Sequence, residues 1–140
     1  MIDFDSHPNN SDPIALINSI DHVRRKHDSI TLLNMMKKTS GKDAVVWGDE
    51  TIGFGYYEYL YKTGRKGKWP LFAFTPSIQS ISIQVMPGYD DYIKLIEKIG
   101  RVKFSGNILT LHKFSEINLP ALEAFLKKAV YDIRKNYTCG

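Results

Sequence analysis

The stretch that decides the fold is IGFGYYEYLYKTGRKGKWPLFAFTP, Ile52–Pro76. Residues 52–61 are rich in aromatic side chains and bounded by turn residues, which predicts a β-strand. Residues 62–68 combine glycines with cations and are expected to form a loop, and residues 71–75 are expected to return as the next strand. The stretch therefore predicts a β-hairpin with a basic tip.

Further strands are predicted on both sides of this hairpin, at residues 44–47, 81–85 and 108–112. The strand at 81–85 alternates apolar with polar residues, which indicates one buried face and one wet or partly covered face. Residues 104–106 are expected to form a turn. Because strands follow one another through short turns, the sheet is expected to be mostly antiparallel.

Helices are predicted before and after these strands. Asp12 followed by Pro13 is typical of a helix start, and Gly41 of a helix end. Between them runs either one long helix to Lys38 or two helices, of which the second is capped by Asp21; the cap-forming residues favour two. The apolar stripe of this region comprises Ile14, Ile17, Ile20, Val23, Ile30, Leu33 and Met36.

Two more helices are predicted towards the end of the chain. The first is capped by Asp90, ends at Gly100 and has an apolar stripe of Tyr92, Ile93, Ile96 and Ile99. The second is capped by Asn118, has Pro120 in its first turn and buries Leu122, Phe125, Leu126, Ala129, Val130 and Ile133. The order of elements predicts an α+β fold in two layers, a mostly antiparallel sheet with helices packed on one face.

The chain of 140 residues suits a single domain. We expect residues 1–11 to be a loose N-terminal segment, residues 12–136 to form the domain and residues 137–140 to be a C-terminal tail. No secretory signal or membrane-length apolar run is recognisable, which predicts a cytoplasmic protein without membrane contact. The lone Cys139 excludes a disulfide framework, and the net charge of +4 permits acidic partners without demanding them.

The predicted strand at 52–61 supplies the candidate site, because side chains alternate along a strand. Gly53 and Gly55 would share one face with the tyrosines and leave a hollow there, which either a bulky neighbour fills or a ligand enters. The alternative is that the tyrosines only pack in the fold and that the basic loop is a solvated tip. The proposed ligand-binding residues are Trp47, Asp49, Phe54, Tyr57, Tyr59, Tyr61, Arg65, Trp69 and Met86. The rings would supply apolar contact, Arg65 an anion anchor and Asp49 an orienting acceptor.

Three quoted motifs carry a family resemblance: VVWGDETIGFGYYEYLYKTGRKGKWPLFAFTP, ISIQVMPGYDDY and GNILTLHKFSEINLPALEAFLKKAV. Over residues 11–130 the chain resembles the YdhG-like family of domains of unknown function. The resemblance implies a small cytoplasmic bacterial α+β domain. One member of that family is described as a frataxin-like iron chaperone, so the resemblance also implies iron as a cofactor candidate.

The residues themselves predict neither a metal site nor catalysis. An iron site would need an exposed cluster of acidic oxygens, and the histidines are scattered. No nucleophile elbow, zinc-protease or dinucleotide motif occurs. We therefore expect a non-enzymatic module that binds a small molecule or a protein, of unknown oligomeric state. The alternatives are a frataxin-like iron-binding chaperone and, less favoured, a single-stranded nucleic-acid binder that uses the basic loop beside the aromatic face.

Overall fold

The computed structural model describes residues 8–60, 63–64, 66–85, 92–100 and 102–140. The elements in chain order are β1 (Pro8–Asn9), α1 (Pro13–Asn18), α2 (Val23–Ser40), β2 (Ala44–Trp47), β3 (Thr51–Phe54), β4 (Tyr57–Leu60), β5 (Lys66–Trp69), β6 (Phe72–Pro76), β7 (Ile81–Gln84), α3 (Ile93–Ile99), β8 (Lys103–Ser105), β9 (Ile108–Leu111), the short 3-10 helix η2 (Phe114–Glu116) and α4 (Leu119–Asn136).

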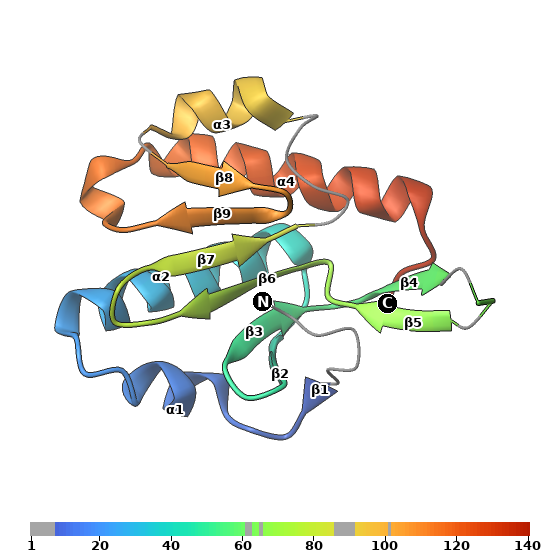
Figure 1. The fold of residues 1–140 in the computed structure, drawn as a ribbon, viewed down its shortest axis with the longest axis horizontal. Helices are drawn as coiled ribbons and strands as arrows, with labels where there is room; N and C mark the ends of the chain where they lie inside the picture. Colours follow the sequence, from blue (N-terminus) through green and yellow to red (C-terminus); the bar gives the residue numbers. More distant parts are fainter. Residues whose placement is uncertain (1–7, 61–62, 65, 86–91, 101) are drawn as a thin grey trace.

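A seven-stranded sheet in the order β1-β2-β3-β6-β7-β9-β8 forms one layer, and every strand pair in it is antiparallel. The strands β4 and β5 form a separate two-stranded sheet. In Figure 1, α2 and α4 run behind the large sheet, with α3 packed on α4 and α1 on α2. The predicted α+β fold with a mostly antiparallel sheet is confirmed.

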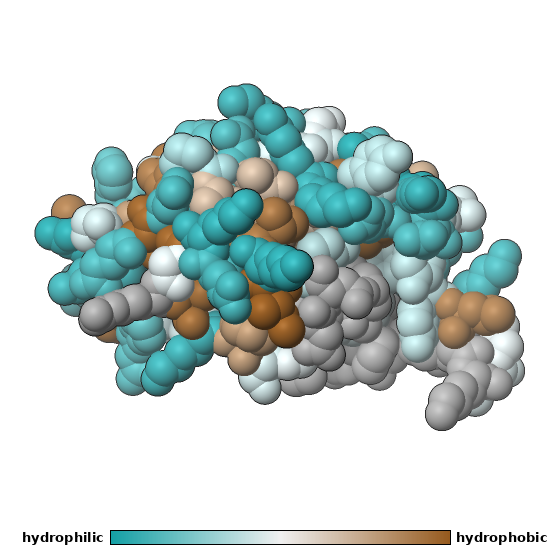
Figure 2. Space-filling view, turned by 90° about the horizontal axis from the view of Figure 1, so that it is seen from above, coloured by the Kyte–Doolittle hydropathy of each residue, from teal (hydrophilic) through white to brown (hydrophobic). Residues whose placement is uncertain are grey.

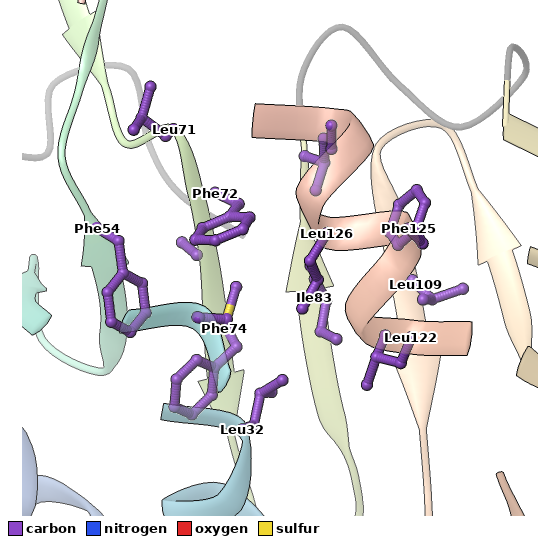
Figure 3. Packing of buried hydrophobic residues seen from close by; sticks show 14 of the residues in the cluster. Leu32, Phe54, Leu71, Phe72, Phe74, Ile83, Leu109, Leu122, Phe125 and Leu126 are labelled. Carbon is purple, nitrogen blue, oxygen red and sulfur yellow. The ribbon is translucent and has the colours of Figure 1, made fainter. Parts of the chain in front are cut away.

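The core lies between the large sheet and the helices (Figure 3). Phe54 of β3 contacts the edge of Phe72 at a centroid distance of 5.7 Å and stacks on Phe74 at 6.5 Å. From the helical side, α4 buries all six residues of its predicted stripe, Leu122, Phe125, Leu126, Ala129, Val130 and Ile133. Burial of this apolar surface is the main source of the fold's stability.

The helix ends follow the expected capping chemistry, with one change. The Asp12 carboxylate accepts the Ile14 N–H at 3.0 Å, as predicted for the start of α1. The region forms two helices, but α2 is capped by His22 rather than Asp21: His22 Nδ1 accepts the Arg25 N–H at 3.0 Å. Gly41 ends α2 in the left-handed region, with φ of 69°.

The single strand predicted at residues 52–61 is wrong. The chain forms β3 and β4, which belong to different sheets. Between them Gly55 has φ of 58°, a conformation that interrupts a strand and that glycine adopts without a steric penalty. The strand β5 was not expected, because it begins at Lys66 inside the predicted loop, whereas the return strand predicted at 71–75 is β6.

Three other segments differ from or go beyond the sequence-based expectations. β8 covers Lys103–Ser105, so the turn expected at 104–106 starts instead at Gly106, which has φ of 61°. Within the expected loose segment, Pro8–Asn9 pairs with β2. The expected cap Asp90 lies outside the described residues; α3 begins at Ile93 and is followed by Gly100.

The C-terminal tail extends the small sheet. The N–H groups of Tyr56 and Glu58 donate to Gly140 O and Thr138 O, both at 2.8 Å, and Gly140 returns a bond to Tyr56 O at 3.0 Å. Between these bonds Cys139 is partly buried, and desolvation by that burial raises the pKa of its thiol, although nearby Arg134 acts in the opposite direction. The tail is therefore packed against the domain.

This packing predicts slow chemistry at Cys139. Because only the thiolate reacts, the single thiol should be alkylated by iodoacetamide several-fold more slowly in the folded protein than in urea. Glu58→Pro deletes the N–H that faces the tail and leaves the N–H groups that face β5, because these alternate along a strand. This variant should accelerate alkylation of the folded protein. Equal rates in folded and unfolded wild-type protein would contradict the docking of the tail.

Candidate ligand-binding site

The structure brings together only part of the predicted aromatic site. Tyr57 lies opposite Trp69, and Tyr59 lies opposite Gly67, on the hairpin of β4 and β5. Trp47 and Phe54 belong to the large sheet, on β2 and β3. Asp49 is exposed in the turn between those two strands, and the remaining three residues, Tyr61, Arg65 and Met86, lie outside the described residues.

Most of the described rings are enclosed by the protein. Phe54, Tyr57, Trp47 and Trp69 are all buried, and only Tyr59 is half-buried. The Tyr57 ring lies 4.9 Å from the ring of Tyr137, at the end of α4. These aromatic side chains therefore contact the interior of the fold rather than an open surface.

The hollow expected above the two glycines is filled by the chain itself. A Cβ on Gly53 would lie 2.7 Å from Trp47 Cδ1 and 2.8 Å from Pro70 Cβ. A Cβ on Gly55 would lie 2.8 Å from both Gly140 O and Leu71 Cδ1. The space above both glycines is therefore filled by neighbouring groups of the protein. No hollow remains there for a ligand.

A cleft of about 700 Å³ lies elsewhere, between the first turns of α2, the helix η2 and the start of α4. On the face seen from above, Figure 2 shows patches of hydrophobic surface among hydrophilic side chains, and Figure 1 shows that α2 and α4 begin at the same end of the molecule. The cleft is lined by Val23, Arg24, His27, Asp28, Thr31, Phe114, Ser115 and Leu119. Its size falls within the range of about 300–1,000 Å³ that is usual for small-molecule sites.

The helix α2 supplies one whole wall of this cleft. The series 23, 27 and 31 and the series 24, 28 and 31 each advance by three or four residues, so these positions share a helix face. Val23 was expected in the apolar stripe, but it is 84% exposed at the start of α2, where it lines the cleft. The apolar wall of the cleft is completed by Phe114 and Leu119.

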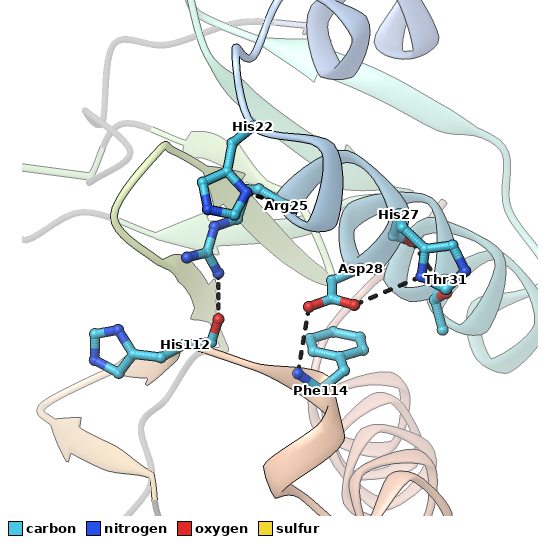
Figure 4. A network of polar contacts seen from close by, with 7 residues as sticks. All are labelled: His22, Arg25, His27, Asp28, Thr31, His112 and Phe114. Carbon is cyan, nitrogen blue, oxygen red and sulfur yellow. Dashed lines mark hydrogen bonds and ion pairs between the residues drawn. The ribbon is translucent and has the colours of Figure 1, made fainter.

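Asp28 places a carboxylate at this cleft (Figure 4). The residue is only 6% exposed. Its Oδ2 accepts the N–H of Phe114 at 3.3 Å, and its Oδ1 lies 3.7 Å from Nδ1 of His27, whose side chain is 81% exposed. The carboxylate thus connects α2 to η2 and borders an apolar cavity.

Arg25 lies three residues before Asp28 on α2, and its side chain points away from the cleft. Its guanidinium donates to the carbonyls of His112, Ile78 and, at 3.1 Å, Gln79. The side chain is 6% exposed. One buried cation therefore joins the start of α2 to the turn between β6 and β7 and to the end of β9.

Among the described residues, no group of three or more His, Cys, Asp or Glu side chains is arranged to hold a metal ion. None of the helices in this part of the chain combines the length and apolar character that crossing a bilayer requires.

Comparisons of the chain with protein-family models, with curated proteins and with solved structures gave no match.

The cleft was not predicted from the sequence, although a signal for it exists. An apolar Val23 directly precedes the charged run of Arg24, Arg25 and Lys26, and Asp28 follows within the same helix face. An aspartate in a helix interior is ordinarily a solvated residue. Its burial depends on η2, a short helix for which the sequence has no periodic pattern.

The close approach at Gly53 predicts a coupled pair of substitutions. Gly53→Ala should destabilise the protein by about 1–3 kcal/mol, because the new methyl group overlaps the Trp47 ring. Trp47→Ala removes that ring, so adding Gly53→Ala to it should cost less than in wild-type protein, although the overlap of the methyl group with Pro70 Cβ remains. Urea denaturation of the three variants measures this coupling. Additive losses would show that the ring does not oppose the methyl group.

The contacts of Arg25 predict a large effect at one of two adjacent arginines. Arg25→Met should lower the free energy of unfolding by about 2–3 kcal/mol, because three carbonyls lose a charged donor. The matched control Arg24→Met, at an exposed position, should change it by less than about 0.5 kcal/mol. Equal effects of the two substitutions in urea denaturation would exclude a special role for Arg25.

Proposed function

We propose that this protein is a non-catalytic binding module and that the cleft between α2, η2 and α4 holds a small amphipathic molecule. The observation that carries the proposal is the composition of the cleft: an apolar wall of Val23, Phe114 and Leu119 beside one buried carboxylate, Asp28. Small-molecule sites commonly combine mostly apolar walls with a few placed polar groups.

The surroundings of the cleft favour binding over catalysis. A transfer or hydrolytic site needs a nucleophile in hydrogen-bonding reach of a base. The hydroxyl of Thr31 donates instead to the backbone carbonyl of His27, at 3.1 Å. His27 in turn extends into solvent. These contacts support a site that holds a molecule rather than one that transforms it.

The proposal does not depend on the family resemblance. Membership of the YdhG-like family, a cytoplasmic location and the iron-chaperone role implied by one family member remain predictions from the sequence. The cleft supports an organic ligand because its wall is largely apolar, whereas iron prefers several oxygen or nitrogen donors.

The test is a binding experiment that shows where on the protein a probe molecule binds. Phenethyl alcohol and indole, as small amphipathic probes, should perturb backbone amide resonances of isotope-labelled protein mainly in residues 23–31 and 114–119. Ser115→Trp, at an exposed position that lines the cleft, should abolish these perturbations. The control Ser105→Trp, exposed on β8, should leave them unchanged. Perturbations centred on another region, or insensitive to Ser115→Trp, would overturn the proposal.

A further inference from the structure

The most informative group in the cleft is the carboxylate of Asp28, because it is buried with few partners. A carboxylate offers about four acceptor positions. The bond from the Phe114 N–H, at 3.3 Å, is longer than the usual 2.7–3.2 Å for this type of bond. The His27 nitrogen, at 3.7 Å, is beyond hydrogen-bonding distance. Much of the acceptor capacity of Asp28 is therefore not used by these two contacts.

Apart from the exposed His27, no basic side chain of the described residues lies close to this carboxylate. Among the described residues, no lysine or arginine nitrogen lies within 4.0 Å of the Asp28 carboxylate. Arg25, one helical turn away, donates to backbone carbonyls on the opposite side. A buried carboxylate is costly unless it is paired with a cation and hydrogen-bonded. A ligand that carries a positive charge would supply the cation that Asp28 lacks.

The neighbours of Asp28 fit the rest of such a ligand. Figure 4 shows the phenyl ring of Phe114 beside the carboxylate. Phe114 lines the cleft but is only 6% exposed, so it offers an ammonium group a small part of its ring beside the carboxylate, where an aromatic ring attracts a cation. Val23 and Leu119, further along the same cleft, offer contact for an apolar body attached to that ammonium.

One residue acts against a cation. Arg24 also lines the cleft. It is exposed to solvent, however, and charges in water are strongly screened, whereas the charge of Asp28 is buried and acts through a medium of lower dielectric constant. The balance favours a cation at the Asp28 end of the cleft.

We propose that the ligand of this cleft is an organic amine with an apolar body, whose protonated nitrogen is held by the Asp28 carboxylate against the ring of Phe114. This inference rests on the proposed function, since it assigns the chemical class of the molecule that the same cleft binds. Asp28 is the charge-selecting residue, and the apolar wall holds the body of the amine.

The experiment compares three probes of nearly equal shape and different charge: phenethylamine, phenethyl alcohol and hydrocinnamate. Calorimetric or resonance titrations should give an affinity for the amine about tenfold higher than for the alcohol, and weaker binding still for the carboxylate. Asp28→Asn should remove the preference for the amine over the alcohol, so that the ratio of the two affinities falls from about ten to about one. The control Asp43→Asn, at an exposed aspartate beyond the end of α2, should leave all three affinities unchanged.

A second variant protects the test against loss of folding at the buried position. Arg24→Gln removes the like charge from the cleft at an exposed site, so it should raise the affinity for phenethylamine about two- to fivefold and not that for phenethyl alcohol. Equal affinities for the three probes, with no effect of either variant, would overturn the amine assignment while the proposed binding function stands. If none of the probes binds in the cleft, the proposed function itself fails.

Discussion

The arrangement of this molecule depends on the buried guanidinium of Arg25. Through three carbonyls it ties the first turn of α2 to the turn between β6 and β7 and to the end of β9, segments more than fifty residues away in the sequence. Sheet and helix layers packed only by apolar contact could slide along each other, because such contact is non-directional. The directed bonds of Arg25 fix the register of α2 on the sheet. The same register places Asp28 against η2, and so forms the cleft.

The sequence predicted the parts of the fold that rest on local patterns. The stripe of α4, the caps at Asp12 and Asn118 and the strand at Ile81 are confirmed, because periodicity and capping are properties of neighbouring residues. The strand predicted at 52–61 failed at Gly55. Its aromatic composition favours extended structure on both sides, and only the tertiary pairing of β3 with β6 and of β4 with β5 decides that the chain turns there.

The candidate site was harder to predict than the fold, because it depends on tertiary contacts and not on local sequence patterns. A glycine in a strand indicates a close approach, but not which group approaches; here Trp47 covers Gly53 from the neighbouring strand. Conversely, nothing local marks Asp28 as buried, since its contact to Phe114 joins positions 86 residues apart. Most of the aromatic residues that were proposed as ligand contacts are buried in the core instead. The α2 residues that line the cleft have no distinctive sequence pattern, and they form a cleft only because η2 packs beside them.

Arg25 and Asp28, two buried charged residues in the first turns of α2, differ in how well the protein satisfies them with hydrogen bonds. A buried ion pair can often be replaced as a whole by apolar residues without loss of stability, so a buried ion calls for a specific contribution. Arg25 makes one, because each acceptor that it reaches belongs to the chain and joins distant segments. Asp28 receives one long hydrogen bond and a distant, exposed imidazole. Asp28 lines a cleft whose wall is largely apolar, and its remaining acceptor capacity is not used by these two contacts. The asymmetry between these neighbours is the physical reason to assign the architecture to Arg25 and ligand recognition to Asp28.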